Sequence, residues 1–419
     1  MNQIESVEAL SLSINNQMVA ILTHYSGGKN IMKFAPEYLA LPSKTRPTLT
    51  LTQLLSPDYL KQVQVRTHRL SPVLSNLLPE GALRQWMSSS LKVHENNEFP
   101  LLAWAANNLP GGLVVSPIKK NDIPLWALSP REQTEAIAID IKHTGQKFSL
   151  AGVQMKFSTI RNDGRYNIGA DIGADSWIIK TPSTVHRNVP ENEYTAMKLA
   201  ELIGVNIPEI ELIPISSLDN LPDIQLPDEP TAYAIKRFDR SEAGRVHTED
   251  FAQIFEVYAH DKYKRFNYEQ IAKALYEHSM DGLKDTQQMA RRLLANIMLA
   301  NGDAHLKNWS VIYPDTVNAV LSPAYDIVTT LPYVEGENGV ALNMNKQKQW
   351  YEINLESFQL WAKRVGIPWP AIKVHLLDAI NIARVQWPQA LDKLPMNDKH
   401  KEILRNHWNN LHGDFKIPN

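Results

Sequence analysis

The alternation of apolar and polar residues divides the chain into a strand-rich first part and a helix-rich second part. Up to about residue 240, short alternating runs are separated by turn residues such as Asn15-Asn16. Beyond that point apolar residues recur mostly at three- and four-residue spacing, which is typical of amphipathic helices. Strands followed by helices predict two lobes, and the junction between two lobes is where a binding site is expected.

Individual elements follow from this pattern. Strands that matter for the chemistry are expected at residues 155–160, 177–182, 231–240 and 309–313. A helix is expected at 192–204, because Pro190 precedes it and Gly204 ends it. The later helices are expected at residues 249–258, 268–278, 285–300, 357–365, 369–387 and 398–411.

Composition excludes several classes of protein. The 419 residues include no cysteine, which rules out disulfides, thiolate metal sites and a cysteine nucleophile. The formal net charge of −2 gives no global basic field of the kind that marks a dedicated nucleic-acid-binding protein. The N-terminus does not have the pattern of a signal peptide, and no stretch approaches the roughly 18 apolar residues of a membrane span. We therefore expect a cytoplasmic protein that does not contact a membrane.

The most informative stretch follows the helix expected at 285–300. Asn301-Gly302 is expected to end that helix, because glycine accepts the left-handed conformation of a C-terminal cap. The next loop holds Asp303 and, five positions later, Asn308. Asp-x₄-Asn is the spacing of a kinase catalytic loop, in which the Asp receives the acceptor's proton and the Asn binds Mg²⁺. The same two residue types are common in solvated turns, so this spacing alone does not decide the function.

Other residues extend the same pattern. Asp326 follows a short hairpin and supplies the second acidic group that the metal needs. Lys180 ends an apolar strand, where a kinase keeps its phosphate-pairing lysine, and Glu193 begins the next helix as its candidate partner. The structural alternatives are an edge-strand lysine and a surface glutamate that the helix dipole favours. Small residues at 149–156 let backbone N–H groups close on an anion, although they are also typical of an ordinary tight turn.

Residues 1–115 are expected to form a small α+β unit with no visible chemistry. Ser26-Gly27-Gly28-Lys29 has a superficial similarity to a phosphate loop, but it lacks the upstream Gly and the following Ser or Thr. We therefore interpret it as the tip of a hairpin. Helices are expected at 82–92 and 101–107, and the unit is expected to pack against the rest of the chain or to bind a partner.

Six ordered segments carry the residues described above. They lie at 149–156, 177–180, 192–194, 236–240, 301–308 and 323–327. In this order they resemble the motifs of the HipA family of toxin serine/threonine kinases, and 76–81 (Asn-Leu-Leu-Pro-Glu-Gly) looks like the matching motif of the family's N-terminal subdomain. The resemblance spans nearly the whole chain, and six ordered motifs are far more specific than any one of them.

The resemblance implies an α+β, two-lobed protein-kinase-like fold of the HipA type. It implies a small α+β N-terminal subdomain at 1–115 and a kinase N-lobe with phosphate loop and hinge at 116–240. A mainly helical C-lobe with the catalytic and metal-binding loops is then expected at 241–419.

The resemblance also implies roles for individual residues. Asp303 is similar to the family's catalytic base, Asn308 and Asp326 to its Mg²⁺ ligands, and Ser149 to its autophosphorylation site. Phosphate on Ser149 is expected to displace the phosphate loop and to switch the kinase off. The implied ATP-binding residues are Ala151, Gly152, Val153, Gln154, Met155, Lys156, Lys180, Lys236, Arg237, Phe238, His305, Leu306, Lys307, Asn308, Tyr325 and Asp326.

Two positions depart from the family's pattern. Lys236 stands where the best-known members have Glu before the Arg-Phe-Asp-Arg run, so we expect the hinge to work through its main chain alone. Met155 replaces a residue that is often charged, which affects the affinity of the phosphate loop rather than the fold.

The implied function is a toxin kinase that uses ATP and Mg²⁺ to phosphorylate a protein, an aminoacyl-tRNA synthetase or another translation component, and so slows growth. The implied partners are a HipB-like helix-turn-helix antitoxin and, through the toxin–antitoxin complex, operator DNA. Two alternatives stay open: a small-molecule phosphotransferase and a catalytically silent co-repressor. HipA-type residues between Asp303 and Asn308 favour a protein acceptor. The presence of Lys180, Asp303, Asn308 and Asp326 argues against a silent protein.

Overall fold

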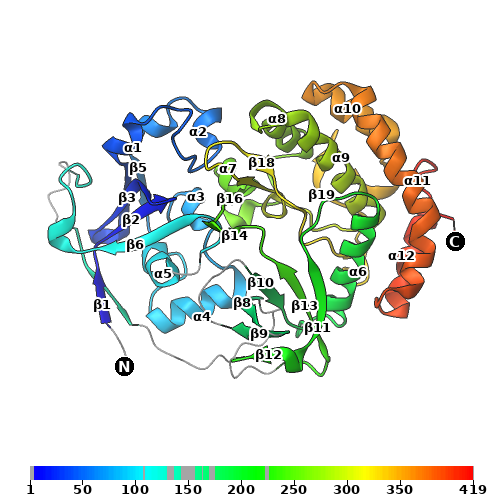
Figure 1. The fold of residues 1–419 in the computed structure, drawn as a ribbon, viewed down its shortest axis with the longest axis horizontal. Helices are drawn as coiled ribbons and strands as arrows, with labels where there is room; N and C mark the ends of the chain where they lie inside the picture. The colour runs from blue at the N-terminus through cyan, green and yellow to red at the C-terminus, as the bar shows by residue number, and fades with distance from the viewer. Residues whose placement is uncertain are drawn as a thin grey trace.

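The computed structural model describes residues 4–106, 109–129, 136–142, 156–162, 164–168, 175–221 and 226–418. Three parts are visible in Figure 1: an N-terminal unit in blue and cyan, a second sheet near the lower centre, and a mainly helical part that runs from olive to red. One hydrophobic cluster lies in the N-terminal unit and a small one in the second sheet, whereas the largest spans the helical part and several residues between 196 and 235 of the second part. This is the α+β, two-lobed architecture that the sequence predicts.

The N-terminal unit is built on an antiparallel sheet of order β5-β4-β3-β2-β6. Asn15 and Asn16 form the tight turn between its first two strands with left-handed φ angles of 48° and 63°, so the predicted turn is confirmed. The sheet consists of β2 (Ala9–Ile14), β3 (Gln17–Tyr25), β4 (Lys29–Phe34), β5 (Gln64–Thr67) and β6 (Leu113–Ile118). A separate pair joins β1 (Ile4–Val7) to β7 (Ile139–Lys142). The helices are α1 (Pro36–Ala40), α2 (Thr52–Leu55), α3 (Pro72–Ser75), α4 (Gly81–Leu91) and α5 (Glu98–Ala105).

The second sheet has six strands in the order β11-β13-β10-β8-β9-β12. They are β8 (Lys156–Asn162), β9 (Arg165–Ile168), β10 (Ser176–Lys180), β11 (Ile210–Pro214), β12 (Leu218–Asp219) and β13 (Thr231–Lys236). Helix α6 (Val189–Leu202) packs against β11 and β13. Trp177 and Ile179 of β10 belong to a small core on one face of the sheet, whereas Ile178 packs on the large core to which α6 contributes. Because side chains alternate along a strand, Lys180 shares the face of Ile178 and is directed toward α6.

The helical part surrounds α9, which is buried over most of its length. Its helices are α7 (Phe251–Ile254), α8 (Tyr268–His278), α9 (Gly282–Met298), α10 (Leu355–Val365), α11 (Trp369–Lys393) and α12 (Asp398–Asn410). Its strands are β14 (Arg240–Ser241), β15 (Gly244–Arg245), β16 (His247–Asp250), β17 (Ser310–Tyr313), β18 (Val320–Leu321), β19 (Gly339–Met344) and β20 (Gln347–Gln349). The helices predicted at 268–278, 285–300, 357–365, 369–387 and 398–411 are confirmed, with ends that differ by a few residues.

The helix predicted at 249–258 is wrong. Glu249 and Asp250 belong to β16, which pairs with β17 in the three-stranded sheet. Asp250 then caps the four-residue helix α7 by accepting a hydrogen bond from the backbone N–H of Gln253. Glu256 takes a left-handed φ of 51° shortly after α7 ends, so the helix does not continue.

The predicted cause of the helix end before the catalytic loop is also wrong. The left-handed residue after α9 is Ala300, with φ 52°, rather than a glycine. Gly302 is suited to its position for a different reason, since a Cβ atom there would clash with the carboxylate of Glu337 and crowd the carbonyl of Gly339. Small size, rather than backbone freedom, is what this position needs.

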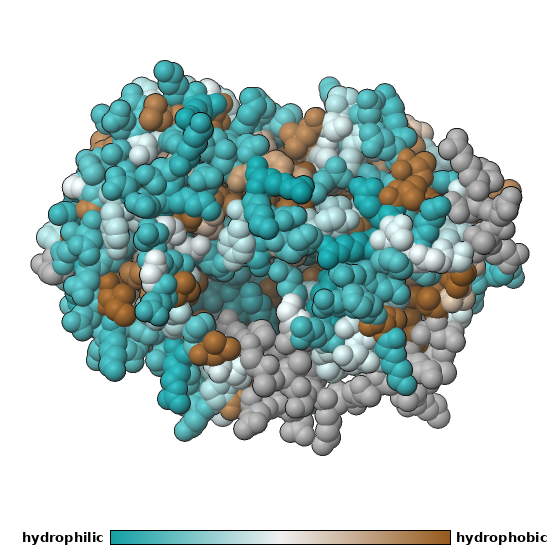
Figure 2. All heavy atoms as spheres, turned by 180° about the vertical axis from the view of Figure 1, so that it is seen from behind, coloured by the Kyte–Doolittle hydropathy of each residue, from teal (hydrophilic) through white to brown (hydrophobic). Residues whose placement is uncertain are grey.

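The face of the molecule in Figure 2 is mostly hydrophilic and is hollowed near the centre. Its hydrophobic residues lie in small separate groups. Among the described residues, no helix is long and apolar enough to cross a bilayer.

Candidate active site

A cavity of about 240 Å³ lies where the three parts of the chain meet. Its lining combines apolar and aromatic side chains with eight charged residues of both signs, which is more charge than a small-molecule site usually carries. The apolar residues include Ile178, Ile235, Phe238 and Tyr325, the charged residues include Lys156, Lys180, Asp250 and Asp326, and the N-terminal unit contributes Asn76 and Pro110.

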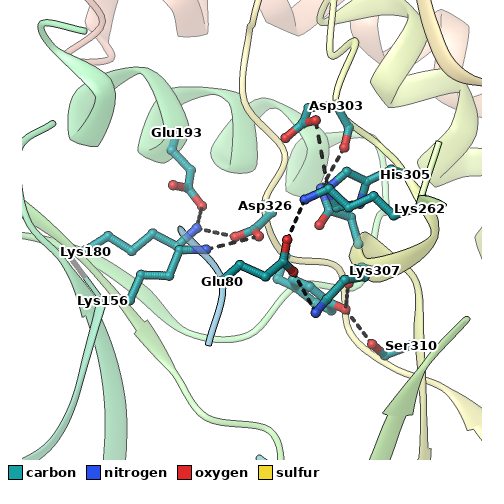
Figure 3. Close-up of polar contacts among 12 residues, drawn as sticks. Glu80, Lys156, Lys180, Glu193, Lys262, Asp303, His305, Lys307, Ser310 and Asp326 are labelled. Carbon is teal, nitrogen blue, oxygen red and sulfur yellow. Dashed lines mark hydrogen bonds and ion pairs between the residues drawn. The ribbon is translucent and has the colours of Figure 1, made fainter. Parts of the chain in front are cut away.

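A buried lysine links two carboxylates on one side of the cavity (Figure 3). Lys180, at the end of β10, donates to Glu193 on α6 and to Asp326 on the loop after β18. The side chains of Lys180 and Glu193 are only 5% and 3% exposed. Burial alone would lower the pKa of Lys180, but the two carboxylates outweigh burial and hold its pKa above the usual value. We call Lys180, Glu193 and Asp326 the Lys180 cluster.

Asp326 has an unusual backbone conformation that directs its side chain into this cluster. Its φ of 54° is left-handed, a conformation that Asp tolerates better than most residues. Lys156 of β8 adds a second cation at 3.4 Å from the carboxylate. Burial would raise the pKa of Asp326, but Lys156 and Lys180 lower it far below the usual range. Asp326 is therefore an anion that two lysines already hold at the cavity wall.

The loop after α9 presents Asp303 at the surface, with its carboxylate 47% exposed. The backbone N–H of Asp303 donates to Asn301 over 3.1 Å, and the Asn308 side-chain amide donates to the Asp303 carbonyl over 2.8 Å. These bonds close the loop and fix the spacing between the two residues. The hydroxyl of Tyr263 donates to the Asp303 carboxylate, which shows that this carboxylate is accessible to a hydroxyl donor.

The other loop residues predicted to bind ATP lie in different surroundings. Leu306 is fully buried in the hydrophobic core, so its side chain is committed to packing. His305 is buried beside Asp303, with 3.9 Å between its Nε2 and the carboxylate. Burial lowers the pKa of His305 to about 4, so its ring is neutral at pH 7. Lys307 pairs with Glu80 of the N-terminal unit.

The predicted hinge lies at the end of β13. The backbone N–H groups of Lys236 and Arg237 donate to Glu209 and Ser176, so both are committed to the sheet. The Arg237 guanidinium is likewise engaged by Asp239, at 2.7 and 2.8 Å. Phe238 lies near Tyr325, with ring centroids 5.7 Å apart, and both rings line the cavity.

The oxygen donors present here suit Mg²⁺. A carboxylate from Asp326 and an amide oxygen from Asn308 are hard ligands of the kind that Mg²⁺ accepts alongside substrate phosphates. Asn308 uses its N–H₂ group on the Asp303 carbonyl, an orientation that assigns its amide oxygen the role of acceptor. The donor set therefore fits the ion, although Asp326 is engaged by lysines and would have to share its carboxylate.

Several predicted residues lie outside the described part of the chain. These are Ser149, Ala151, Gly152, Val153, Gln154 and Met155.

Sequence reasoning also missed residues that the structure brings to the site. Asp250 lines the cavity, and burial raises its pKa to about 6. Tyr263 contacts Asp303, and Glu80 contacts Lys307.

A six-stranded sheet with a buried Lys–Glu pair to its helix, joined to a helical lobe that carries the Asp303 loop, defines a two-lobed protein-kinase-like fold. The HipA-like C-terminal domain model matches residues 148–387, and the HipA N-terminal domain model matches residues 10–116. The chain is 34% identical over 406 residues to the Sinorhizobium fredii protein named "Putative kinase Y4dM", with 96% of each chain covered. This chain belongs to the HipA family.

More distant matches agree with this assignment. The chain is 23% identical to the serine/threonine-protein kinase toxin HipA of Shewanella oneidensis, over 75% of each sequence. It is also similar in fold to a chain in the solved complex of HipA, HipB and operator DNA from Shewanella oneidensis, with a TM-score of 0.69 and 19% identity. That match covers 95% of this chain and 94% of the other. At this identity the structural likeness supports the fold.

Proposed function

We propose that this chain is an ATP-dependent serine/threonine protein kinase of the toxin type. The observation that carries the proposal is Lys180, which joins Glu193 and Asp326 beside a cavity with an aromatic wall. A lysine held by a helix glutamate beside a metal-binding aspartate is the arrangement that protein kinases use for ATP phosphates.

In the proposed reaction, the adenine of ATP packs against Phe238 and Tyr325, and its phosphates lie toward Lys156 and Lys180. Asp303 accepts the proton of the acceptor hydroxyl as that oxygen attacks the γ-phosphorus, and the bond to the leaving ADP oxygen breaks. Mg²⁺, held by Asn308 and Asp326, would neutralise charge on the phosphates when it is bound. The buried Lys180 stays protonated, so it stabilises negative charge on the phosphates throughout transfer.

The partners are proposed by family likeness. The acceptor is an aminoacyl-tRNA synthetase or another translation component, and its phosphorylation would slow growth. A HipB-like antitoxin would neutralise the kinase and connect it to operator DNA, a pairing that the related complex of HipA, HipB and operator DNA suggests. Phosphorylation of Ser149 would switch the kinase off.

The test is intact-mass analysis of the purified protein before and after incubation with Mg-ATP. One added phosphate on the wild-type chain, absent from Asp303→Gln and from Ser149→Ala, is the expected result. Phosphate on the Ser149→Ala variant would support the proposed kinase but assign the regulatory site to another residue. No phosphate on any variant, with ATP bound, would favour the small-molecule phosphotransferase or the silent co-repressor.

A further inference from the structure

The N-terminal unit reaches the catalytic loop through one carboxylate. Glu80 accepts from Lys307 over 2.7 Å and from Lys262 over 3.0 Å (Figure 3). Lys307 belongs to the Asp303–Asn308 loop, and Lys262 belongs to the segment between α7 and α8. We call Glu80, Lys262 and Lys307 the Glu80 cluster. It joins two separate segments of the helical part to a third segment from the N-terminal unit.

The segment that carries Glu80 is hydrogen-bonded both within the N-terminal unit and to the helical part. Glu80 is the residue directly before α4, and Asn76 directly follows α3. The Asn76 side-chain amide donates to Pro72 over 2.9 Å within the unit and to Val257 over 2.8 Å in the helical part. The carbonyl of Asn76 accepts a second bond from Lys307, at 3.3 Å. Lys307 is therefore held by two acceptors from the N-terminal unit.

Charge explains why the two lysines lie close together. Their ammonium groups converge on a single carboxylate, and two like charges at this separation repel each other unless an anion lies between them. Burial would raise the pKa of Glu80, but Lys307 and Lys262 outweigh burial and lower the pKa to about 2. Glu80 is therefore ionised at every pH at which the chain is expected to work.

Both lysines adjoin groups that contact the candidate base. Lys307 precedes Asn308, whose side chain bonds the Asp303 carbonyl. Lys262 precedes Tyr263, whose hydroxyl donates to the Asp303 carboxylate. A displacement of either lysine would therefore be transmitted directly to the surroundings of Asp303. The Lys180 cluster shares no residue with this arrangement.

We propose that Glu80 is a positioning residue for phosphoryl transfer, contributed by the N-terminal unit, which acts by holding Lys307 and Lys262 beside Asp303. This inference rests on the proposed kinase activity and deepens it, because it makes the N-terminal unit a part of the active site. Glu80 does not line the nucleotide cavity, so its effect falls on the transfer step rather than on ATP binding.

The experiment follows self-phosphorylation at a series of Mg-ATP concentrations and compares the wild-type chain with Glu80→Gln. The expected result is a maximal rate lower by about tenfold or more, because small displacements of catalytic groups have effects of this size or larger. The ATP concentration for half-maximal rate should change by less than about threefold. Thr48→Val is the matched control. It also removes one bond between the N-terminal unit and the helical part, from the Thr48 hydroxyl to the Val317 carbonyl, and should keep the wild-type rate.

Two further variants separate positioning from general structure. Glu80→Asp keeps the charge, so its maximal rate should lie between the rates of Glu80→Gln and the wild-type chain. In a Lys307→Met background, Glu80→Gln should cost much less than it does alone, since the side chain through which it mainly acts is gone. A Glu80→Gln variant that transfers phosphate at the wild-type rate or faster would overturn the inference. So would a Glu80→Gln substitution that lowers the rate as much in the Lys307→Met background as it does in the wild-type chain. A wild-type chain that transfers no phosphate would instead refute the proposed kinase.

Discussion

The Lys180 cluster and the Glu80 cluster both pair lysines with carboxylates, but they are built in opposite ways. In the first, one buried lysine is shared by two carboxylates from the second sheet's helix and the helical part. In the second, one carboxylate that is 39% exposed is shared by two lysines. Burial strengthens the attraction between the charges of the Lys180 cluster, whereas water screens the attraction within the Glu80 cluster. We expect the first to matter for stability and nucleotide binding, and the second for the rate of transfer.

The largest expected effect comes from the base that lies beside the Glu80 cluster. Asp303→Gln should lower self-phosphorylation by about 10²–10⁴-fold, the range that a positioned general base contributes. Thermal stabilisation by Mg-ATP should be kept, because Asp303 does not line the cavity. Measuring transfer and thermal stabilisation on the same preparation separates the two steps. Loss of the thermal stabilisation would mean that Asp303 belongs to nucleotide binding, and the division between the clusters would fail.

Within the Lys180 cluster, Lys180→Met should reduce folding stability by about 3–5 kcal/mol, because it leaves Glu193 and Asp326 without their shared cation in a buried site. Lys156→Met is the matched control, since Lys156 contacts the same Asp326 but is 51% exposed. That variant should lose at most about 1 kcal/mol. Urea unfolding of both variants without nucleotide measures the difference, and equal losses would show that burial does not distinguish these two lysines.

The contrast between the clusters also explains what could be predicted from sequence. Lys180 ends a recognisable strand and Glu193 lies at the start of a recognisable helix, so local patterns place one at a strand end and the other in the helix that follows. Ordered motifs add Asp326 by resemblance. For these residues, strand period, helix caps and motif order are enough to suggest that they come together.

Glu80 and Asp250 could not be placed in the same way. Glu80 lies 182 positions before Lys262, and no period or spacing relates them. The segment 76–81 includes Glu80 by resemblance but gives it no role, and a carboxylate before a helix is otherwise indistinguishable from an ordinary helix-start residue. For Asp250, the apolar run that follows it favours a helix, whereas pairing of β16 with β17 brings in a partner 60 positions later, Ser310. Contacts between distant segments decide both positions, and a single sequence does not display them.

Another carboxylate, Glu249, lies outside both clusters and tests whether burial alone accounts for the difference between them. It is buried like Lys180, but its partners are neutral: the Leu51 N–H, at 2.6 Å, and the Tyr313 hydroxyl. Burial raises the pKa of Glu249 from 4.5 to about 7. Between these values the folded chain binds more protons than the unfolded chain, so stability is present below pH 4.5 and is lost as pH rises toward 7.

Glu249→Gln should remove this dependence, because the amide cannot ionise and still offers an acceptor to Leu51 and Tyr313. At pH 8 the variant should be more stable than wild type by on the order of 2–3 kcal/mol, and the gap should narrow at pH 5. Unfolding midpoints measured at both pH values provide the test. The same difference in unfolding midpoint between the two proteins at both pH values would mean that Glu249 titrates at its ordinary pKa in the folded chain.

The smallest expected effect is on the stability of the Glu80 cluster. Glu80→Gln should change the free energy of unfolding by at most about 1 kcal/mol, because ion pairs that water reaches contribute little. Added salt should shrink even that difference, whereas it should leave the loss in Lys180→Met nearly unchanged, since buried pairs are screened much less. Urea unfolding at low and high salt measures both responses. A loss in Glu80→Gln as large as that in Lys180→Met would make Glu80 a structural link between the N-terminal unit and the helical part, and the two clusters would then share one role.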